Sequence, residues 1–374
     1  MTQKATLRTT ALYALHQDLG ARLVAFAGYH LPVQYPEGII AEHLHTRRGA
    51  SLFDVSHMGQ ITVTGPAAQQ ELESLMPVDL DALVTGQACY ALLTNDSGGV
   101  EDDLIVTRIT PDSFWLVVNG ACKTNDLALL EQGCSTSTVT LNEQQALLAL
   151  QGPKARGILG ASVPAIATLP FMHSLEALIG GAACRISCSG YTGEDGFEIA
   201  LAAADAERVA RALLADHDVA MAGLGARDSL RLEAGLCLYG HELRPDVTPI
   251  EAGLQWAIPR SRRAAGSRPG GYPGAAILDR QLTDGVERRR VGLRVTGKRP
   301  VREGQRIVSS DGQPLGEVTS GGFGPTVDAP IAMGFVSPEV STPGTELAVE
   351  VRGTTLAVTV APLPFVPQRY YRNK

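Results

Sequence analysis

The spacing of apolar residues changes near residue 290, and this change divides the chain into two parts. Before it, windows with apolar residues at helical spacing alternate with short strand-like runs. The clearest helical windows are 39–48, 121–132 and 204–217. After Val291, apolar residues occupy almost every second position, as they do in strands. We therefore predict a mixed α and β part followed by a small all-β domain, either a barrel or a sandwich.

The first part combines hairpins and helices without a repeating βαβ unit, which favours an α+β fold over a doubly wound sheet. One predicted hairpin joins 103–109 to 113–119, and another joins 184–188 to 197–201. Two prolines in 31–36 predict an ordered loop, because proline fits neither a helix interior nor a central strand.

Composition narrows the class of protein. A length of 374 residues suggests two or three domains, and 44% hydrophobic with 19% charged residues is typical of a soluble globular protein. No apolar run approaches the roughly 18 residues of a membrane span. A net charge of −7 gives no overall positive field for nucleic acid. The N-terminal residues lack the apolar core of a secretion signal, so we expect a cytoplasmic protein.

Cysteine and histidine usage gives no sign of a metal centre. The six cysteines form no C-x-x-C pair and no zinc spacing, which indicates buried free thiols in a reducing compartment. The histidines are scattered, so we expect no metal. Arginine, glycine and proline concentrate around 261–274, which we interpret as an insertion or linker in a solvated loop.

An acidic stretch at 98–106 combines two glycines, three consecutive carboxylates and a strand-like apolar run. Successive strand residues point to opposite faces, so Asp102 and Asp103 should face different surroundings. One carboxylate then faces a pocket while the other does not. A solvated acidic turn is the alternative.

Two further segments supply polar groups for a pocket. Phe197 and Ile199 should face the core, which points Glu198 the other way, where its carboxylate could accept two N–H bonds from an amino-pyrimidine edge. A solvated hairpin residue is the alternative. The segment 223–228 begins like a dinucleotide loop, but Asp228 stands where the last glycine belongs, so NAD is excluded.

The same loop is better interpreted as the start of a helix over 227–238 that places Arg227 at a pocket, as a planar donor for a carboxylate or a heterocycle. The alternative is an ion pair with Asp228 or Glu233. No nucleophile motif is present, which suits a reaction whose substrate supplies the nucleophile while the protein positions and polarises it.

Six segments in order resemble the aminomethyltransferase family, the T-protein of the glycine cleavage system. They are 53–59 (FDVSHMG), 98–106 (GGVEDDLIV), 151–153 (QGP), 190–198 (GYTGEDGFE), 223–228 (GLGARD) and 319–326 (TSGGFGPT). The resemblance runs from about Leu12 to the C-terminal region. It implies a multidomain, cloverleaf-like arrangement of mixed and antiparallel sheets with a C-terminal β-barrel. The implied domains are 1–54 with 140–250 (folate-binding), 55–139 with 251–285, and 286–374.

The resemblance also implies the reaction. Such enzymes pass the carbon of an aminomethyl group, held on the lipoyl arm of H-protein, to tetrahydrofolate, with release of ammonia and formation of 5,10-methylenetetrahydrofolate. The folate N5 is the attacking nitrogen, which agrees with the missing protein nucleophile. Tetrahydrofolate is the implied co-substrate. We expect no bound metal, and neither a nucleic acid nor a membrane as a partner. An arginine-rich loop could meet an acidic surface of H-protein.

The resemblance assigns roles to particular residues. Asp103 is the catalytic carboxylate, Asp102 is structural, and the two glycines let the loop approach a ligand closely. Glu198 and Arg227 hold the pterin. The remaining pocket positions are Tyr90, Asn119, Tyr191 and Met58, with Tyr239 as a weaker match.

Two other functions stay open at this stage. The first is another tetrahydrofolate-dependent demethylase on the same scaffold, which the intact Glu101-Asp-Asp block and the lack of a fused flavin domain disfavour. The second is a non-catalytic folate-binding protein, which is disfavoured because 235–240 lacks the Lys-Gly-Cys-Tyr type of motif found in that group.

Overall fold

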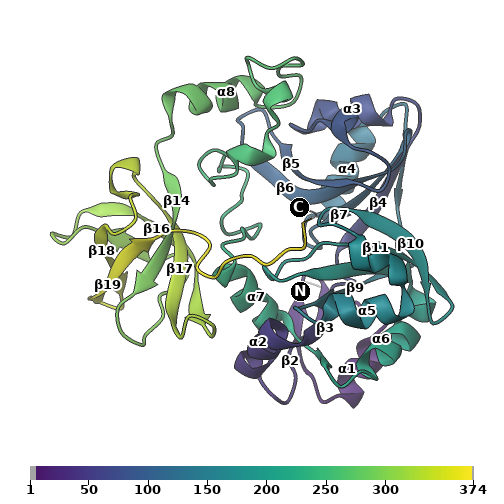
Figure 1. The fold of residues 1–374 in the computed structure, drawn as a ribbon. Helices are drawn as coiled ribbons and strands as arrows, with labels where there is room; N and C mark the ends of the chain where they lie inside the picture. The colour runs from purple at the N-terminus through teal and green to yellow at the C-terminus, as the bar shows by residue number, and fades with distance from the viewer. Residues whose placement is uncertain (1–5, 373–374) are drawn as a thin grey trace.

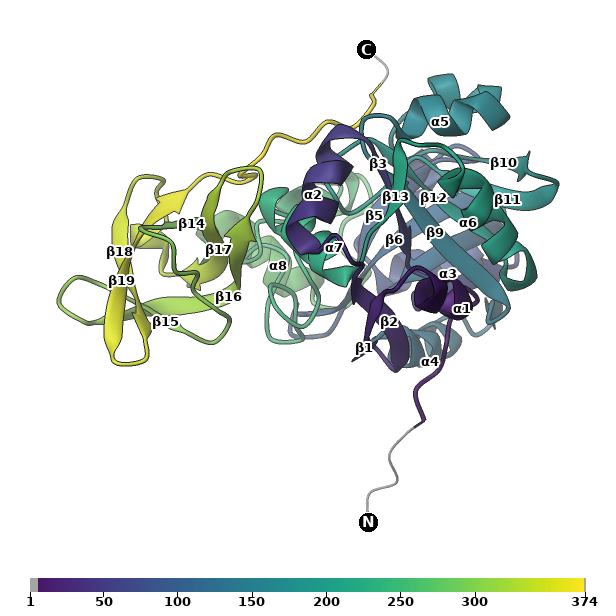
Figure 2. The same ribbon diagram turned by 90° about the horizontal axis from the view of Figure 1, so that it is seen from below.

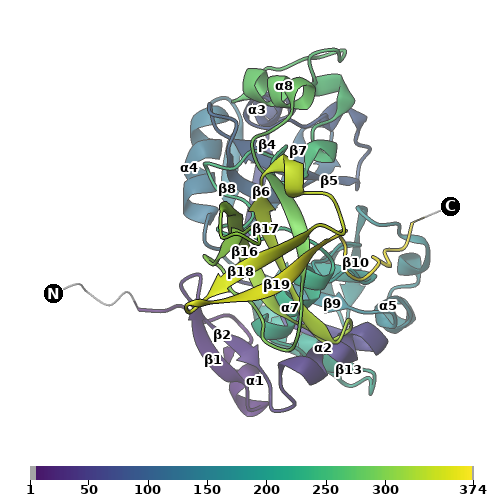
Figure 3. The ribbon, with the colours of Figure 1, turned by 90° about the vertical axis from the view of Figure 1, so that its left-hand side faces the viewer.

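Two open sheets and a closed barrel form the framework of the computed structural model, which describes residues 6–372. The barrel lies to one side of the two sheets, as the views in Figures 1 and 2 agree. In Figure 3 the barrel faces the viewer, with α8 (Ala275–Asp284) above it and the hairpin of β1 (Arg22–Phe26) and β2 (Tyr29–Gln34) below. These features confirm the predicted α+β fold with a C-terminal barrel.

The first sheet has the strand order β10-β11-β12-β9-β3-β13, and only the β13–β3 pair is parallel. Its strands are β3 (Ala50–Asp54), β9 (Gln145–Gln151), β10 (Ser174–Ile179), β11 (Ala182–Ser187), β12 (Gly196–Ala202) and β13 (Val219–Met221). The neighbouring helices are α1 (Tyr13–Asp18), α2 (Ile39–Arg48), α5 (Ala155–Ser162), α6 (Ala206–Leu214) and α7 (Leu224–Glu233), with 3-10 turns η2 (Pro164–Thr168) and η3 (Ala203–Asp205).

The second sheet is antiparallel, with the order β5-β6-β7-β4-β8. Its elements are β4 (Gly59–Thr64), β5 (Ala88–Thr94), β6 (Val100–Thr110), β7 (Ser113–Val118), β8 (Thr138–Leu141), α3 (Ala68–Leu75), α4 (Lys123–Gly133) and η1 (Leu80–Ala82). Short turns η4 (Gln255–Ala257) and η5 (Arg260–Arg262) follow later in the chain.

Strand alternation brings the two sheets together. Leu148 and Leu150 of β9 pack with α5 and α6, whereas Leu147 and Ala149 of the same strand face Trp115 on β7 of the second sheet. Both sets are buried, because side chains of period two divide between the two faces. The candidate site borders the cluster that contains Leu147, Ala149 and Trp115.

The barrel closes in the order β14-β17-β16-β15-β18-β19. Its elements are β14 (Arg289–Val295), β15 (Arg306–Val308), β16 (Pro314–Gly324), β17 (Ala329–Val336), β18 (Glu346–Val351), β19 (Thr354–Ala361) and the turn η6 (Pro338–Val340). The alternating Leu347, Val349 and Val351 form part of its buried interior. Period two alone had left a barrel and a sandwich equally open, and pairing of β14 with β19 makes it a barrel.

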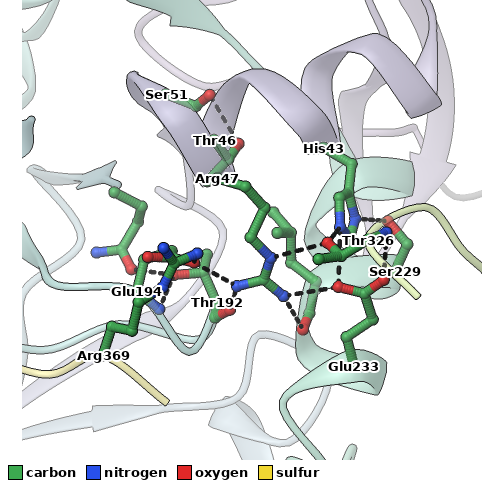
Figure 4. Close-up of polar contacts among 12 residues, drawn as sticks. His43, Thr46, Arg47, Ser51, Thr192, Glu194, Ser229, Glu233, Thr326 and Arg369 are labelled. Atoms are coloured by element: carbon green, nitrogen blue, oxygen red, sulfur yellow. Dashed lines mark hydrogen bonds and ion pairs between the residues drawn. The ribbon is translucent and has the colours of Figure 1, made fainter. Parts of the chain in front are cut away.

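A buried polar network joins the barrel to the first sheet and its helices (Figure 4). Arg47 of α2 donates to Glu233 of α7 at 3.0 Å and to Glu194 at 2.8 Å. Thr326, in the turn between β16 and β17, donates its backbone N–H to Glu233 at 2.7 Å. From the C-terminal segment, Arg369 donates to Glu194 at 2.6 Å. The barrel is therefore held by the hydrogen bond from Thr326 to this buried charged network as well as by the chain connection.

Three predicted segments differ from the structure. Residues 31–36 were expected to be a loop, but 31–34 belong to β2, where Pro32 is tolerated because the two-stranded sheet has open edges. The helix expected over 227–238 is α7, which ends at Glu233, and the following residues are irregular. The basic segment is not a solvated loop throughout: Arg262 is buried and donates to the backbone oxygens of Val78 and Glu73, both at 2.9 Å.

The proposed division into 1–54 with 140–250, 55–139 with 251–285 and 286–374 stays a prediction. Within residues 6–372, no helix has both the length and the apolar character needed to cross a membrane. The N-terminal residues considered for a targeting signal lie partly outside this range, since residues 1–5 are not described.

Candidate active site

A cavity of about 1770 Å³ lies between the two sheets, α7 and the barrel. All the residues predicted for the site line it: Met58, Tyr90, Asp103, Asn119, Tyr191, Glu198, Arg227 and Tyr239. They come from distant parts of the chain, and the C-terminal segment adds Tyr370 and Arg372 to the wall. The cavity is therefore assembled only when both sheets and the last residues are in place.

Asp103 lines the cavity, while Asp102, one residue earlier on β6, is fully buried on the other side of the strand. Tyr90 donates its hydroxyl to Asp103 Oδ2 at 3.0 Å, and Asn119 Nδ2 donates to Oδ1 at 2.9 Å. Burial, followed by the charge of Asp102, raises the pKa of Asp103 to about 7. A carboxyl group with such a pKa exchanges protons readily near neutral pH.

Glu198 extends from β12 into the cavity, as strand alternation predicted, because its neighbours Phe197 and Ile199 are buried in the core of the first sheet. Ser189 donates its hydroxyl to Glu198 Oε2 at 2.7 Å. Among residues 6–372 we find no second donor to this carboxylate. It keeps acceptor capacity for a ligand that presents N–H groups.

Arg227, near the start of α7, also faces the cavity with an unused donor. Its guanidinium lies over the Tyr191 ring, 4.8 Å from the centroid. Nη1 is buried and has no hydrogen-bond acceptor within the described residues. Burial lowers the pKa of Arg227, and the charge of Glu198 opposes this effect. A buried donor of this kind is costly unless a ligand supplies the acceptor.

The alternative ion pairs considered for Arg227 do not form in the structure. Asp228 instead accepts a hydrogen bond from Arg231 at 2.8 Å, and Glu233 pairs with Arg47. Arg227 is therefore free of the two carboxylates nearest to it in sequence.

The remaining predicted residues shape the walls. Met58 packs against the cluster between the two sheets, and Tyr239 packs against the same buried cluster as Tyr90. Tyr191 donates its hydroxyl to the backbone oxygen of Cys237, which fixes the ring beneath the Arg227 guanidinium.

Two lining residues were missed in the sequence. His57 is 3% exposed, and its Nδ1 has no partner within the described residues. Burial, then the charge of Arg227, lowers the pKa of His57 to about 3, so the ring is neutral. Trp256 stacks on Tyr90 with centroids 5.4 Å apart and is 63% exposed at the cavity rim. His57 stands within a motif that was noticed, whereas no local pattern marks Trp256.

The glycines of the acidic stretch have a different role from the one expected. A Cβ at Gly99 would lie 1.8 Å from the backbone oxygen of Pro245, and one at Gly98 would meet Ile277. Neither glycine lines the cavity. They allow the chain to pack closely against another segment, not against a ligand.

A group of potential metal ligands lies away from the cavity. Asp216, His217 and Asp218 have donor atoms within 4.8 Å of one another, but none of the three lines the cavity. Exposed acidic groups of this kind are common without a metal. The expected absence of a metal stays a prediction.

Two family models match this chain, one over the two-sheet body and one over the barrel. Residues 12–262 match the family described as GCVT N-terminal domain, and residues 288–367 match the glycine cleavage T-protein C-terminal barrel domain. The crystal structure of the glycine cleavage system aminomethyltransferase T from Bartonella henselae is similar throughout, with a TM-score of 0.93 and 44% identity. That match covers 98% of this chain and 100% of the other.

Curated relatives correct the expected location. The mitochondrial aminomethyltransferase of Dictyostelium discoideum is 42% identical over 97% of this chain and 94% of its own length. The Homo sapiens mitochondrial aminomethyltransferase is 44% identical over 98% and 92%, respectively. The expectation of a cytoplasmic protein is therefore wrong. The missing secretion signal had supported it, but that feature does not distinguish the cytoplasm from a mitochondrion.

The family matches span both the two-sheet body and the barrel, and the relatives exceed 40% identity over nearly the whole chain. The acidic stretch, the glutamate and the arginine selected in the sequence meet in one cavity of this shared fold. The chain belongs to the aminomethyltransferase family of glycine cleavage T-proteins.

Proposed function

We propose that the protein transfers the carbon of an aminomethyl group from the lipoyl arm of H-protein to tetrahydrofolate. The reaction releases ammonia and the reduced lipoyl thiol and forms 5,10-methylenetetrahydrofolate. The observation that carries this proposal is the cavity in which the unpaired Arg227 donor and the Glu198 acceptor face the same space as Asp103. When bound, tetrahydrofolate supplies the nucleophilic nitrogen that the protein does not offer.

The polar groups at one side of the cavity suit a pterin ring. Glu198 accepts N–H bonds from the amino-pyrimidine edge, since Ser189 occupies only one of its oxygens. Arg227 Nη1 donates to the ring carbonyl and gains the acceptor that it lacks within the described protein. Met58 contributes an apolar wall that excludes water from these bonds.

Asp103 is the catalytic residue in this proposal. Tyr90 and Asn119 fix its two oxygens in orientation, so no reorganisation is needed when charge develops on the reacting carbon. The carboxylate stabilises that positive charge and accepts a proton from the attacking nitrogen. Its raised pKa, about 7, suits both taking up and releasing the proton.

The test is an assay of 5,10-methylenetetrahydrofolate formation from aminomethylated H-protein and tetrahydrofolate. The wild-type protein should form the product, and Asp103→Asn should lose roughly 10²–10⁴-fold in turnover while retaining folate binding. Asp96→Asn, in the exposed turn before β6, is the matched control and should retain full activity. Near-normal turnover of Asp103→Asn would contradict the role of Asp103.

The assay also separates this function from a related one. A dimethylglycine-type methylamine offered in place of aminomethylated H-protein should give no product. Efficient turnover of that donor, with none from H-protein, would replace the proposed function by a demethylase.

A further inference from the structure

Asp126, on the first turn of α4, is a buried acid that the mechanism above does not use. Its side chain is 0% exposed, and neither carboxyl oxygen faces an N–H or O–H donor of another described residue. An ionised carboxylate in this position would be strongly disfavoured, because it has lost water and gained no donor. A proton on Asp126 removes that cost.

A second acid, Asp102, lies beside Asp126. Their carboxyl groups lie within hydrogen-bonding reach of each other. Asp102 also accepts bonds from Asn119, from the backbone N–H at 3.0 Å and from Nδ2 at 2.8 Å. Two carboxyls in contact share a proton when no cation balances them. Within residues 6–372, neither forms an ion pair with a lysine, an arginine or a histidine.

Asn119 connects this pair to the cavity. Its Nδ2 donates to Asp102 Oδ1 at 2.8 Å and to Asp103 Oδ1 at 2.9 Å. The amide is thus held between a buried carboxyl and the carboxyl that lines the cavity. Hydrogen bonds therefore run from Asp102 through Asn119 to Asp103.

We propose that Asp126 is a positioning residue that carries the shared proton and donates it in a hydrogen bond to an ionised Asp102, which in turn orients Asn119 against Asp103. The proposal deepens the proposed function and rests on it only for the role of Asp103. The protonated pair itself is independent of any activity.

The charges around the pair agree with this assignment. Burial, then the charge of Asp102, raises the pKa of Asp126 to about 9, so Asp126 keeps its proton at neutral pH. Burial also raises the pKa of Asp102, but the hydrogen bonds from Asp126 and Asn119 oppose the shift. The other titratable groups that act on the pair and on Asp103 are Glu101 on β6, the Cys122 thiol before α4, and Tyr90, Tyr191, Cys237 and Tyr239 around the cavity.

An ionised Asp102 directly behind Asp103 raises the pKa of Asp103, whereas a protonated Asp102 would not. The position of the proton within the pair therefore sets the pH at which Asp103 changes its charge.

Infrared spectroscopy of the whole protein tests the proton directly. At pH 7 the wild type should show a protonated-carboxyl C=O band that Asp126→Asn lacks and that Asp96→Asn, a change at an exposed site, retains. If Asp126→Asn does not fold, ¹³C-aspartate labelling of the wild type serves instead at pH 8, where Asp103 is mostly ionised, and the band that remains there should disappear only as the pH rises through about 9. Absence of such a band at pH 7 would overturn the proposal, whether or not the enzyme is active with H-protein.

The pH dependence of turnover tests the positioning role. Asp126→Asn changes no charge if Asp126 is already protonated, so the acid limb of the profile should stay in place. Asp102→Asn removes the charge behind Asp103 and should move that limb to lower pH by ~1 unit. A shift of similar size in Asp126→Asn would mean that Asp126 is ionised and would overturn the assignment.

Discussion

At the scale of single residues, burial and the charge of Asp102 raise the pKa of Asp103, and the Tyr90 hydroxyl opposes them. The net value of about 7 means that Asp103 is protonated below this pH and a base only above it. We therefore expect turnover to rise as the pH passes through about 7. A measurement of kcat between pH 5.5 and pH 8.5 checks this, and a flat profile would contradict it.

Tyr90→Phe should shift the pH dependence of turnover in a defined direction. Loss of the hydroxyl removes a hydrogen bond that favours the ionised carboxyl, so the pKa of Asp103 should rise and the acid limb should move to higher pH. The Asp102→Asn variant should move it in the opposite direction. Equal shifts of the same sign in both variants would show that Asp103 does not determine the limb.

Glu198→Ala should weaken tetrahydrofolate binding because the pterin edge loses a charged acceptor. Loss of a hydrogen bond to a charged group costs about 1.5–3 kcal/mol, which corresponds to a rise of roughly ten- to a hundredfold in Kd. Titration calorimetry measures the change. Glu143→Ala, at an exposed position between β8 and β9, is the control, and an unchanged Kd for Glu198→Ala would rule out the role.

Wherever a residue lies in a strand, the sequence predicts the side to which its side chain points. Alternation separates Asp102 from Asp103 and turns Glu198 away from the core, as the structure has them. It gave no information on Asp126 or His57, because their importance depends on contacts between segments far apart in the chain. Only the tertiary structure brings such groups together.

At the scale of elements, the basic segment that begins in η5 binds the α3 region beside the second sheet. Arg262 donates to the backbone oxygens of Val78, Glu73 and Gly270, and Arg268 pairs with Glu73 at 2.7 Å and with Asp79. The composition predicted a linker, because counts of arginine and glycine do not reveal buried carbonyl acceptors. These two arginines are already occupied, which argues against using them to bind a partner.

Arg262→Ala should accordingly destabilise the protein. The substitution leaves the three backbone oxygens that accept from Arg262 without their donor. We expect the free energy of unfolding to fall by about 3 kcal/mol. Arg260→Ala, at an exposed neighbouring position, should have no comparable effect. Denaturant unfolding measures both, and similar losses for the two variants would show that the contacts of Arg262 contribute little.

Local rules also failed at β2. Pro32 predicted a loop, but an edge strand does not need its missing N–H, so the strand forms. The position of a strand at the edge of a sheet depends on which other strands pair with it. The sequence of the segment alone does not predict that position. The barrel strands were predictable because a strict period of two extends over the whole domain.

At the scale of the whole molecule, Glu233 connects the two-sheet body to the barrel. It accepts bonds from Arg47 and from the backbone N–H of Thr326, and it contacts His43 at 3.0 Å (Figure 4). This contact forms only when the barrel and the body are packed together, because Glu233 belongs to the body and Thr326 to the barrel. Because the barrel also lines the cavity through Thr319 and Ser320, its attachment bears on the active site as well as on stability.

The pKa of Glu233 predicts how this attachment depends on pH. Burial alone would raise it, but bonds from His43 and Thr326 and the charge of Arg47 lower it to about 2, from 4.5 in the unfolded chain. The stabilisation is therefore fully present above pH 4.5 and is lost as the pH falls through 2. A shift of this size corresponds to about 3 kcal/mol.

Glu233→Gln should consequently lower the free energy of unfolding by about 3 kcal/mol at pH 7, because a neutral amide does not balance the buried Arg47. The difference from wild type should shrink as the pH approaches 2, where the wild-type carboxyl also becomes neutral. Glu346→Gln, on the exposed side of β18, should unfold like the wild type at every pH. Denaturant unfolding at pH 7 and pH 3 measures the difference in free energy of unfolding between Glu233→Gln and the wild type. An equal difference at both pH values would mean that the charge of Glu233 does not stabilise the protein.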